Sequence, residues 1–267
     1  MTPKINIGIL ISGTGTNMDA IINACEDGKI NGSVIFVGSD NADAKGLGKA
    51  AAKNIPTFVV DYADIIREFK KNPKMSVLPA NFDFKDIRSK QTFFNDDADT
   101  EKITSFLCTR AIAEARLLEE MKQYPYDLLV LAGFMRNLTP YFIDRVNRQP
   151  GKPKIMNIHP ALLPAFAGTD GYGDTFRYGC KVGGCTVHFI DYGEDSGPII
   201  GQRCFPIEEN DTIESIKKKG LALEWELYPE CIRLFAENRL HTVKMTYTLD
   251  SGRVIQRTVV KIAQKVD

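Results

Sequence analysis

The chain has 267 residues, a length that fits one large α/β domain or two small ones. Hydrophobic residues make up 43% and charged residues 25% of the sequence, which supports a packed core and excludes an intrinsically disordered chain. Lys plus Arg and Asp plus Glu each number 34, so the net charge is zero, and no basic run points to a nucleic-acid partner.

The sequence also argues against a membrane protein and a metal centre. No apolar run approaches the ~20 residues of a membrane helix, and the opening residues lack the architecture of a signal peptide. The six cysteines form no CxxC pair and no Cys/His cluster with zinc spacing. We therefore expect a reduced, cytoplasmic, metal-free protein with no nucleic-acid or membrane partner.

Residues 1–60 predict a βαβαβ unit. The apolar run at residues 5–11 indicates a strand, and helical spacing begins at Asn17. Residues 34–37 and 57–60 indicate two further strands, separated by an alanine- and lysine-rich helix that ends near Lys53. This alternation is typical of a doubly wound, mostly parallel, Rossmann-like α/β sheet with helices on both faces.

Residues 61–126 do not follow that pattern. Both ends have helical spacing, at residues 65–69 and 100–121, whereas residues 72–99 are mixed and polar and contain two prolines. Long irregular segments inside compact domains are uncommon unless they act as lids or binding loops. We interpret residues 61–126 as a long insertion, and the sequence leaves open whether it is a lid or a surface decoration or oligomer contact.

Residues 127–240 return to alternating elements. Strands are predicted at 127–132, 154–158, 184–190 and 199–207, with a short helix after Thr139 and a long one from about Asp211 to Glu237. Within residues 241–267, the runs 242–249 and 254–262 flank a Gly-containing turn and predict a C-terminal β-hairpin. We expect one domain over residues 1–267, with a phosphate-binding part at 1–60 and a catalytic part at 127–240.

The first chemical motif is the glycine-rich turn at residues 12–17, Ser-Gly-Thr-Gly-Thr-Asn, between a strand and a helix. Successive N–H groups of such a turn point at one anion, and the helix dipole adds partial positive charge. The motif lacks the third glycine of a dinucleotide site and the Gly-Lys-Ser/Thr of a triphosphate site. It fits a single phosphate, although an ordinary βα turn has the same composition.

The second motif combines residues that suit acyl transfer. Asn157 and His159 project to the same side of a predicted strand, and both can donate hydrogen bonds to an oxygen that gains negative charge. Asp195, in a turn between two later strands, can accept a proton from an attacking amine. The alternatives are a satisfied core histidine and a solvated loop acid; His188 and His241 are interpreted as structural. No Gly-x-Ser-x-Gly elbow indicates an acyl-enzyme, so direct transfer is favoured.

These pieces, in this order, resemble the glycinamide ribonucleotide formyltransferase family. The resemblance rests on ISGTGTNMDAII (11–22), LVLAGFMRNLTPYFI (129–143), MNIHPALLP (156–164) and GCTVHFIDYGEDSGPII (184–200). It implies that a formyl group passes from 10-formyltetrahydrofolate to the amine of 5'-phosphoribosylglycinamide in purine biosynthesis, without an acyl-enzyme. The resemblance leaves open whether the protein forms a homodimer.

The same resemblance implies roles for individual residues. The catalytic set would be Asn157, His159 and Asp195. Phosphoribosylglycinamide would be held by Gly13, Gly15, Thr16, Asn17 and Glu224. The folate pocket would comprise Leu131, Met135, Arg136, Leu138, Ile143, Ile190, Tyr192 and Asp195. Two features depart from the family: residues 169–173 stand where histidines are often found, and residues 61–126 are longer than a short helical crossover.

Other members of the folate formyl class remain as alternatives. A formyltetrahydrofolate hydrolase is expected to carry a regulatory domain before the first strand, and a methionyl-tRNA formyltransferase to carry a basic C-terminal domain. A sugar-nucleotide N-formyltransferase shares the Asn-x-His and Asp elements but lacks the Ser-Gly-x-Gly-x-Asn loop. A non-catalytic folate-binding homologue is least favoured because Asn157, His159 and Asp195 are all present.

Overall fold

A central sheet organises the computed structural model, which describes residues 3–73, 76–94 and 98–264. Within those residues the sheet has seven strands in the order β3-β2-β1-β4-β5-β6-β7, parallel from β3 to β5 and antiparallel through β6 and β7. The strands are β1 (Ile5–Ile11), β2 (Gly32–Ser39), β3 (Thr57–Val59), β4 (Leu128–Leu131), β5 (Ile155–His159), β6 (Val182–Phe189) and β7 (Ile199–Pro206).

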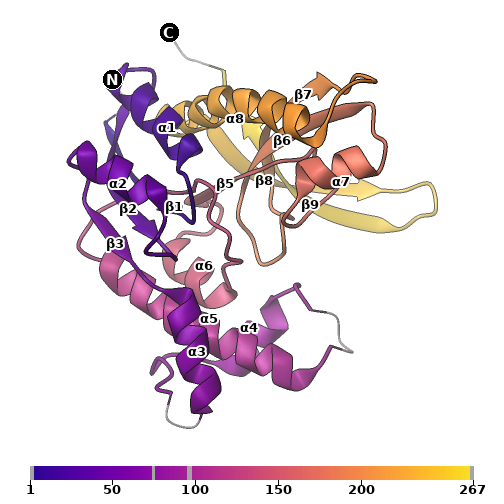
Figure 1. Ribbon diagram of the computed structural model, residues 1–267. Helices are drawn as coiled ribbons and strands as arrows, with labels where there is room; N and C mark the ends of the chain where they lie inside the picture. The colour runs from indigo at the N-terminus through magenta and orange to yellow at the C-terminus, as the bar shows by residue number, and fades with distance from the viewer. Residues whose placement is uncertain (1–2, 74–75, 95–97, 265–267) are drawn as a thin grey trace.

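Helices cover both faces of this sheet (Figure 1). They are α1 (Thr16–Glu26), α2 (Lys45–Ala52), α3 (Tyr62–Lys71), α4 (Phe84–Lys90), α5 (Thr100–Met121), α6 (Pro140–Val146), α7 (Gly171–Arg177) and α8 (Ile213–Ala236). One core cluster joins the sheet to α1 and α8, and a second joins its other face to α3, α5 and α6. The predicted doubly wound α/β fold is confirmed.

Side-chain alternation along β1 explains why the sheet is buried on both faces. Ile7 and Ile9 belong to the core cluster of α1 and α8, whereas Leu10 belongs to the cluster beneath the sheet. Gly8 leaves room there for a neighbouring ring, because a Cβ at this position would lie 2.2 Å from the Phe36 side chain. The glycine in this isoleucine-rich strand is thus a packing requirement.

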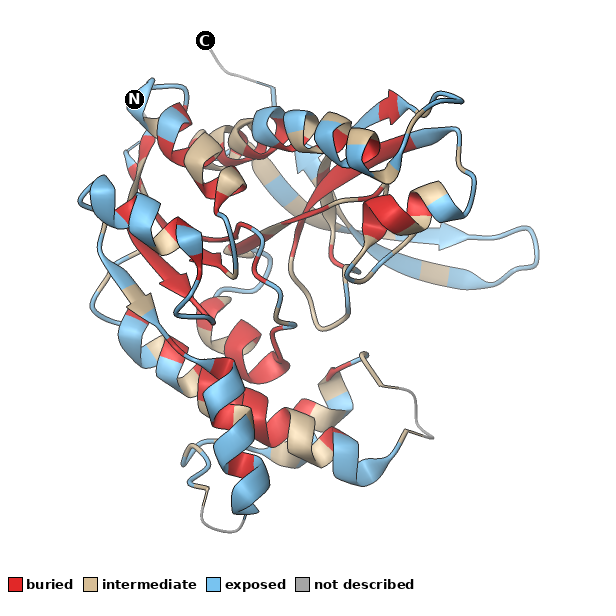
Figure 2. Ribbon diagram, in the orientation of Figure 1, coloured by how far each residue is buried: buried red, intermediate tan, exposed pale blue. Residues whose placement is uncertain are grey.

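The region 61–126 is built around helix α5. The second half of α5 packs beneath the sheet through Ala113 and Leu117, so part of this region belongs to the main core. The first half forms an outer cluster with Ile87 of α4 and Tyr141 of α6. Figure 2 shows buried residues continuing from the sheet through α6 into α5. Helix α4 lies inside the stretch that the sequence left irregular, and Asp83 caps its N-terminus.

Glu114 of α5 is a fully buried carboxyl group. Its two oxygens accept from the backbone N–H and the hydroxyl of Thr139, at 2.7 and 2.5 Å, and so hold the N-cap of α6. Burial raises the pKa of Glu114 to about 8, although the hydrogen bonds from Thr139 oppose the shift. The folded chain therefore keeps a proton on Glu114 that the unfolded chain releases near its ordinary value of 4.5.

This shift predicts a pH-dependent stability. Between about pH 4.5 and 8 the free energy of unfolding should fall as pH rises, by up to about 1.4 kcal/mol per pH unit. Glu114→Gln should remove the contribution of Glu114 and make that slope shallower, as measured by urea unfolding across a pH series. Glu120→Gln, exposed on the same helix, should keep it, and equal slopes in wild type and Glu114→Gln would contradict the prediction.

The C-terminal hairpin forms a sheet of its own. Strands β8 (Leu240–Thr248) and β9 (Val254–Ile262) pair antiparallel, and their turn projects beyond the body (Figure 1). Leu240 and Val260 pack against the core at the base. The hairpin starts one residue before the predicted segment 241–267, whose last three residues lie outside the described part of the chain.

Candidate active site

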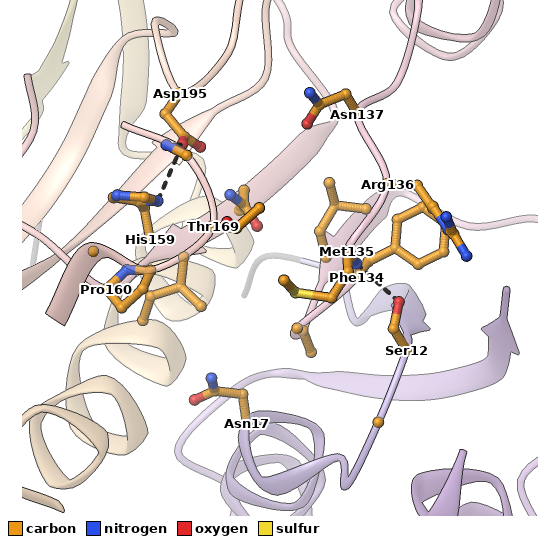
Figure 3. A pocket seen from close by; sticks show the side chains of 18 of the residues that line it. Ser12, Asn17, Phe134, Met135, Arg136, Asn137, His159, Pro160, Thr169 and Asp195 are labelled. Atoms are coloured by element: carbon orange, nitrogen blue, oxygen red, sulfur yellow. Dashed lines mark hydrogen bonds and ion pairs between the residues drawn. The ribbon is translucent and has the colours of Figure 1, made fainter. Parts of the chain in front are cut away.

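The site lies at the carboxyl ends of β1, β4 and β5. The chain winds from β1 towards β2 and β3 on one side and to β4 on the other, and such a reversal opens a crevice for a ligand. Two backbone-anchored contacts join the loops across it: Ser12 N–H donates to the Gly133 carbonyl (3.0 Å), and Met135 N–H donates to Ser12 Oγ (2.8 Å; Figure 3).

A cavity of about 520 Å³ occupies this crevice. Residues predicted for the catalytic set, for the phosphate-binding turn and for the folate pocket all line it. Those that line it are Gly13, Gly15, Thr16, Asn17, Leu131, Met135, Arg136, Leu138, Asn157, His159, Ile190, Asp195 and Glu224. The other two folate candidates, Ile143 and Tyr192, do not line it: Ile143 is buried in the core beneath the sheet, and the Tyr192 hydroxyl donates to Asp144.

The glycine-rich turn has the geometry of an anion site. Gly15 is the N-cap of α1 with φ 71°, a left-handed conformation that favours glycine. A Cβ at Gly15 would lie 3.0 Å from the Gly46 Cα, because the start of α2 packs on the turn. The first N–H groups of an α-helix have no intrahelical acceptor. They are therefore free to bind an anion that enters the cavity at this end.

Glu224 lies beside this turn and is 5% exposed. Its Oε2 accepts from Asn17 Nδ2 at 2.7 Å, and its Oε1 accepts from the Tyr172 hydroxyl at 2.6 Å. Burial raises the pKa of Glu224, and these two hydrogen bonds oppose the rise. Tyr172, which sequence reasoning did not single out as a site residue, thus holds this carboxyl group in position and opposes the rise in its pKa.

Helix α8 is locked onto the strands that carry the site. Tyr228, one turn after Glu224, is fully buried, and its hydroxyl shares a proton between the carbonyl oxygens of Met156 (2.8 Å) and Leu131 (3.1 Å). These carbonyls belong to β5 and to the last residue of β4. The position of the Glu224 carboxyl group relative to Asn157 on β5 is therefore fixed.

His159, which is buried, pairs with Asp195, which is partly buried. His159 Nδ1 lies 3.1 Å from Asp195 Oδ2, and His159 Nε2 lies 2.7 Å from the Phe166 carbonyl (Figure 3). Because both partners are acceptors, the doubly protonated imidazolium satisfies them. Burial alone would lower the pKa of His159, but the Asp195 carboxylate and the Phe166 carbonyl outweigh it and raise the pKa. Burial would raise the pKa of Asp195, but the hydrogen bond and the positive charge of His159 outweigh it and hold the pKa well below its usual range.

Asn157 is oriented by His188 of the neighbouring strand. His188 Nδ1 lies 3.0 Å from the Phe189 carbonyl and therefore donates to it, which leaves Nε2 to accept from Asn157 Nδ2 at 3.2 Å. One amide N–H of Asn157 remains for another acceptor in the cavity. His188, interpreted from sequence as structural, is also 3.6 Å from Asp195 and so belongs to the site.

Opposite this group, the loop after β4 forms the other wall. Met135 is 58% exposed and points into the open space between the loops. The Arg136 guanidinium turns away from His159 in Figure 3, donates to Asp40 and lies 5.3 Å from the Tyr62 ring centroid. Backbone and apolar groups, with Ile190 facing them, therefore make up most of this wall.

Comparison with known proteins identifies the family. Residues 5–232 match the family described as formyl transferase. The chain belongs to this formyl transferase family. A phosphoribosylglycinamide formyltransferase of Haemophilus influenzae is 35% identical over 234 residues, 88% of each chain. The crystal structure of glycinamide ribonucleotide transformylase 1 from Symbiobacterium toebii has a TM-score of 0.69 and 35% identity, and covers 97% of this chain and 94% of that one.

Some family members are much longer. The trifunctional purine biosynthetic protein adenosine-3 of Chironomus tentans is 33% identical over 236 residues, yet the chain spans 14% of its length. The family expected from the sequence motifs is confirmed. Within residues 3–73, 76–94 and 98–264, no cluster of His, Cys, Asp and Glu suits a metal ion, and no helix of this formyl transferase is long and apolar enough to cross a bilayer.

Proposed function

We propose that the chain transfers the formyl group of 10-formyltetrahydrofolate to the amine of 5'-phosphoribosylglycinamide. One observation carries the proposal: a single cavity joins an anion-binding turn, the Asn157–His159–Asp195 group and an apolar wall. The turn and Glu224 suit the phosphorylated acceptor, and the wall that includes Leu131 and Ile190 suits the flat pterin. Two substrates bound in one cavity can react directly, because proximity replaces an acyl-enzyme step.

The charges of the site support this reaction. As the neutral amine attacks the formyl carbon, the carbonyl oxygen gains negative charge. The remaining N–H of Asn157 and the positive charge of His159 stabilise that oxygen. Asp195 keeps His159 protonated and, as a carboxylate, accepts the proton that the amine releases, through water, before the proton passes to the folate nitrogen. The bond from carbon to the folate nitrogen then breaks, and formylated product and tetrahydrofolate leave.

The test is formyl transfer by the purified protein. Absorbance of the released folate is followed with 5'-phosphoribosylglycinamide, with a free-amine sugar nucleotide and without an acceptor. Turnover with phosphoribosylglycinamide alone is the expected result. Folate release without an acceptor would indicate a hydrolase, turnover with the sugar nucleotide would indicate the other transferase class, and folate binding without any turnover would indicate a non-catalytic homologue.

Tyr172→Phe tests the acceptor end of the cavity. Loss of the hydroxyl leaves Glu224 Oε1 without its donor, which costs on the order of 1 kcal/mol. The KM for phosphoribosylglycinamide should rise about 5-fold, with a smaller change in the KM for the folate, as measured by steady-state kinetics. Tyr178→Phe, which alters an exposed tyrosine of the same region, is the control. Equal KM values in Tyr172→Phe and wild type would contradict the assignment of Glu224.

A further inference from the structure

The region 61–126 reaches the cavity through one short segment. Phe93, between α4 and α5, lines the cavity together with Asn137 and Glu194. No sequence motif pointed to Phe93, because residues 72–99 carry no periodic signal. Its aromatic side chain is half-buried.

The backbone of this segment is fixed by a buried side chain. Gln91 is 4% exposed, and its Oε1 accepts from the N–H groups of Phe93 (2.7 Å) and Phe94 (3.2 Å). Such local hydrogen bonds hold a turn in one conformation without secondary structure. The Phe93 and Phe94 rings also approach Phe106 of α5 edge-on, at centroid distances of 6.4 and 5.2 Å. Phe93 is therefore held in place before a ligand binds.

The same segment is attached to the loop that carries Asp195. Thr92 N–H donates to the Tyr192 carbonyl at 3.2 Å, and a Cβ at Gly193 would lie 2.7 Å from Thr92 Oγ1, so glycine permits this close approach. Asp144 of α6 joins both sides, because Lys90 Nζ lies 2.9 Å from its Oδ2 and the Tyr192 hydroxyl donates to its Oδ1. The segment 90–93 and the loop 190–195 thus form one wall.

We propose that Phe93 is a folate-binding residue, packing against an aromatic ring of the bound donor, so that the region 61–126 completes the donor pocket. The inference rests on the proposed function. An aromatic pair contributes about 0.5–1.5 kcal/mol beyond area burial. Tyr192, predicted from the family resemblance as a pocket residue, then acts from behind the wall by positioning the segment that carries Phe93.

The experiment measures the dissociation constant of tetrahydrofolate for wild type, Phe93→Ala, Phe93→Tyr and Phe94→Ala. Phe94 packs on Phe106 in the outer cluster and does not line the cavity, so Phe94→Ala controls for loss of local packing. Phe93→Ala should weaken binding about 3- to 10-fold, and Phe93→Tyr should restore it. The KM for phosphoribosylglycinamide should stay unchanged in both Phe93 variants. A parallel titration with 6-methyltetrahydropterin identifies the ring: equal weakening indicates the pterin, and weakening for tetrahydrofolate alone indicates the aminobenzoyl ring.

Two outcomes would overturn this inference: equal affinities of Phe93→Ala and wild type, or an equal loss in Phe94→Ala. Both outcomes count only if the wild-type protein transfers formyl groups and binds tetrahydrofolate. A wild type that did neither would instead defeat the proposed function, and this inference with it.

Discussion

His159→Ala and Asp195→Asn are each expected to lower kcat by ~10²-fold or more. The first removes the imidazolium beside the developing oxyanion, and the second removes the carboxylate that raises the pKa of His159. Single-turnover and steady-state formyl transfer measure the effect. His241→Ala, on the C-terminal hairpin and exposed, is the matched control and should retain wild-type kcat. Near-normal turnover in both site variants would refute the mechanism.

The same pair predicts a pH profile. In the wild type the pKa of His159 is raised above its ordinary value of 6.5. The positive charge, and the stability that it contributes, are fully present below pH 6.5 and are lost as pH rises through the raised pKa. In Asp195→Asn, the carboxylate no longer opposes the effect of burial on the pKa of His159, so this pKa should fall relative to wild type and the residual activity should decline at a lower pH. If activity declined at the same alkaline pH in Asp195→Asn and in the wild type, the coupling between Asp195 and His159 would be contradicted.

Gly15→Val should chiefly weaken binding of the ribonucleotide. Valine is strained at φ 71°, and its Cβ would lie 3.0 Å from the Gly46 Cα, so the turn must move. We expect the KM for phosphoribosylglycinamide to rise ~10-fold or more, since a distortion of 1–3 kcal/mol corresponds to about that factor.

The control for Gly15→Val is Gly48→Ala. Gly48 lies on α2, and a Cβ there meets nothing within 4 Å. Its KM should equal that of the wild type, and a thermal melt of each variant checks that the chain is folded. An unchanged KM in Gly15→Val would remove the phosphate assignment.

The sequence predicted most strands and long helices because their periodicity is local. Residues 5–11 became β1 and residues 100–121 became α5, within a residue or two of the expected bounds. Helix α7 was missed: Gly171 and Gly173 oppose a helix, and tertiary packing supplies what propensity lacks. The Tyr172 ring there occupies the space above Gly220 of α8, where a Cβ would lie 2.1 Å from the ring.

Site residues in local sequence motifs could likewise be predicted, whereas those placed by tertiary contacts could not. Asn157, His159 and Asp195 stand in recognisable strings, and the fold brings them together. Tyr172 and Phe93 belong to segments without periodicity or motif. The position of Tyr172 depends on its contact with Glu224, 52 residues further along the chain, and that of Phe93 on the contact of its neighbour Thr92 with Tyr192, 100 residues further along. The role of His188 depends on strand register, because β6 places it opposite Asn157.

The buried hydroxyl of Tyr228 has a thermal consequence. It joins α8 to β5 and to the carboxyl end of β4, so the Glu224 carboxyl group and the Asn157 and His159 side chains share one frame before a ligand binds. Ordering of these groups is accomplished once, when the chain folds, and is not repeated in each catalytic cycle. Heat should therefore leave the catalytic geometry intact until the whole frame melts, and the midpoint of inactivation should coincide with the midpoint of global unfolding.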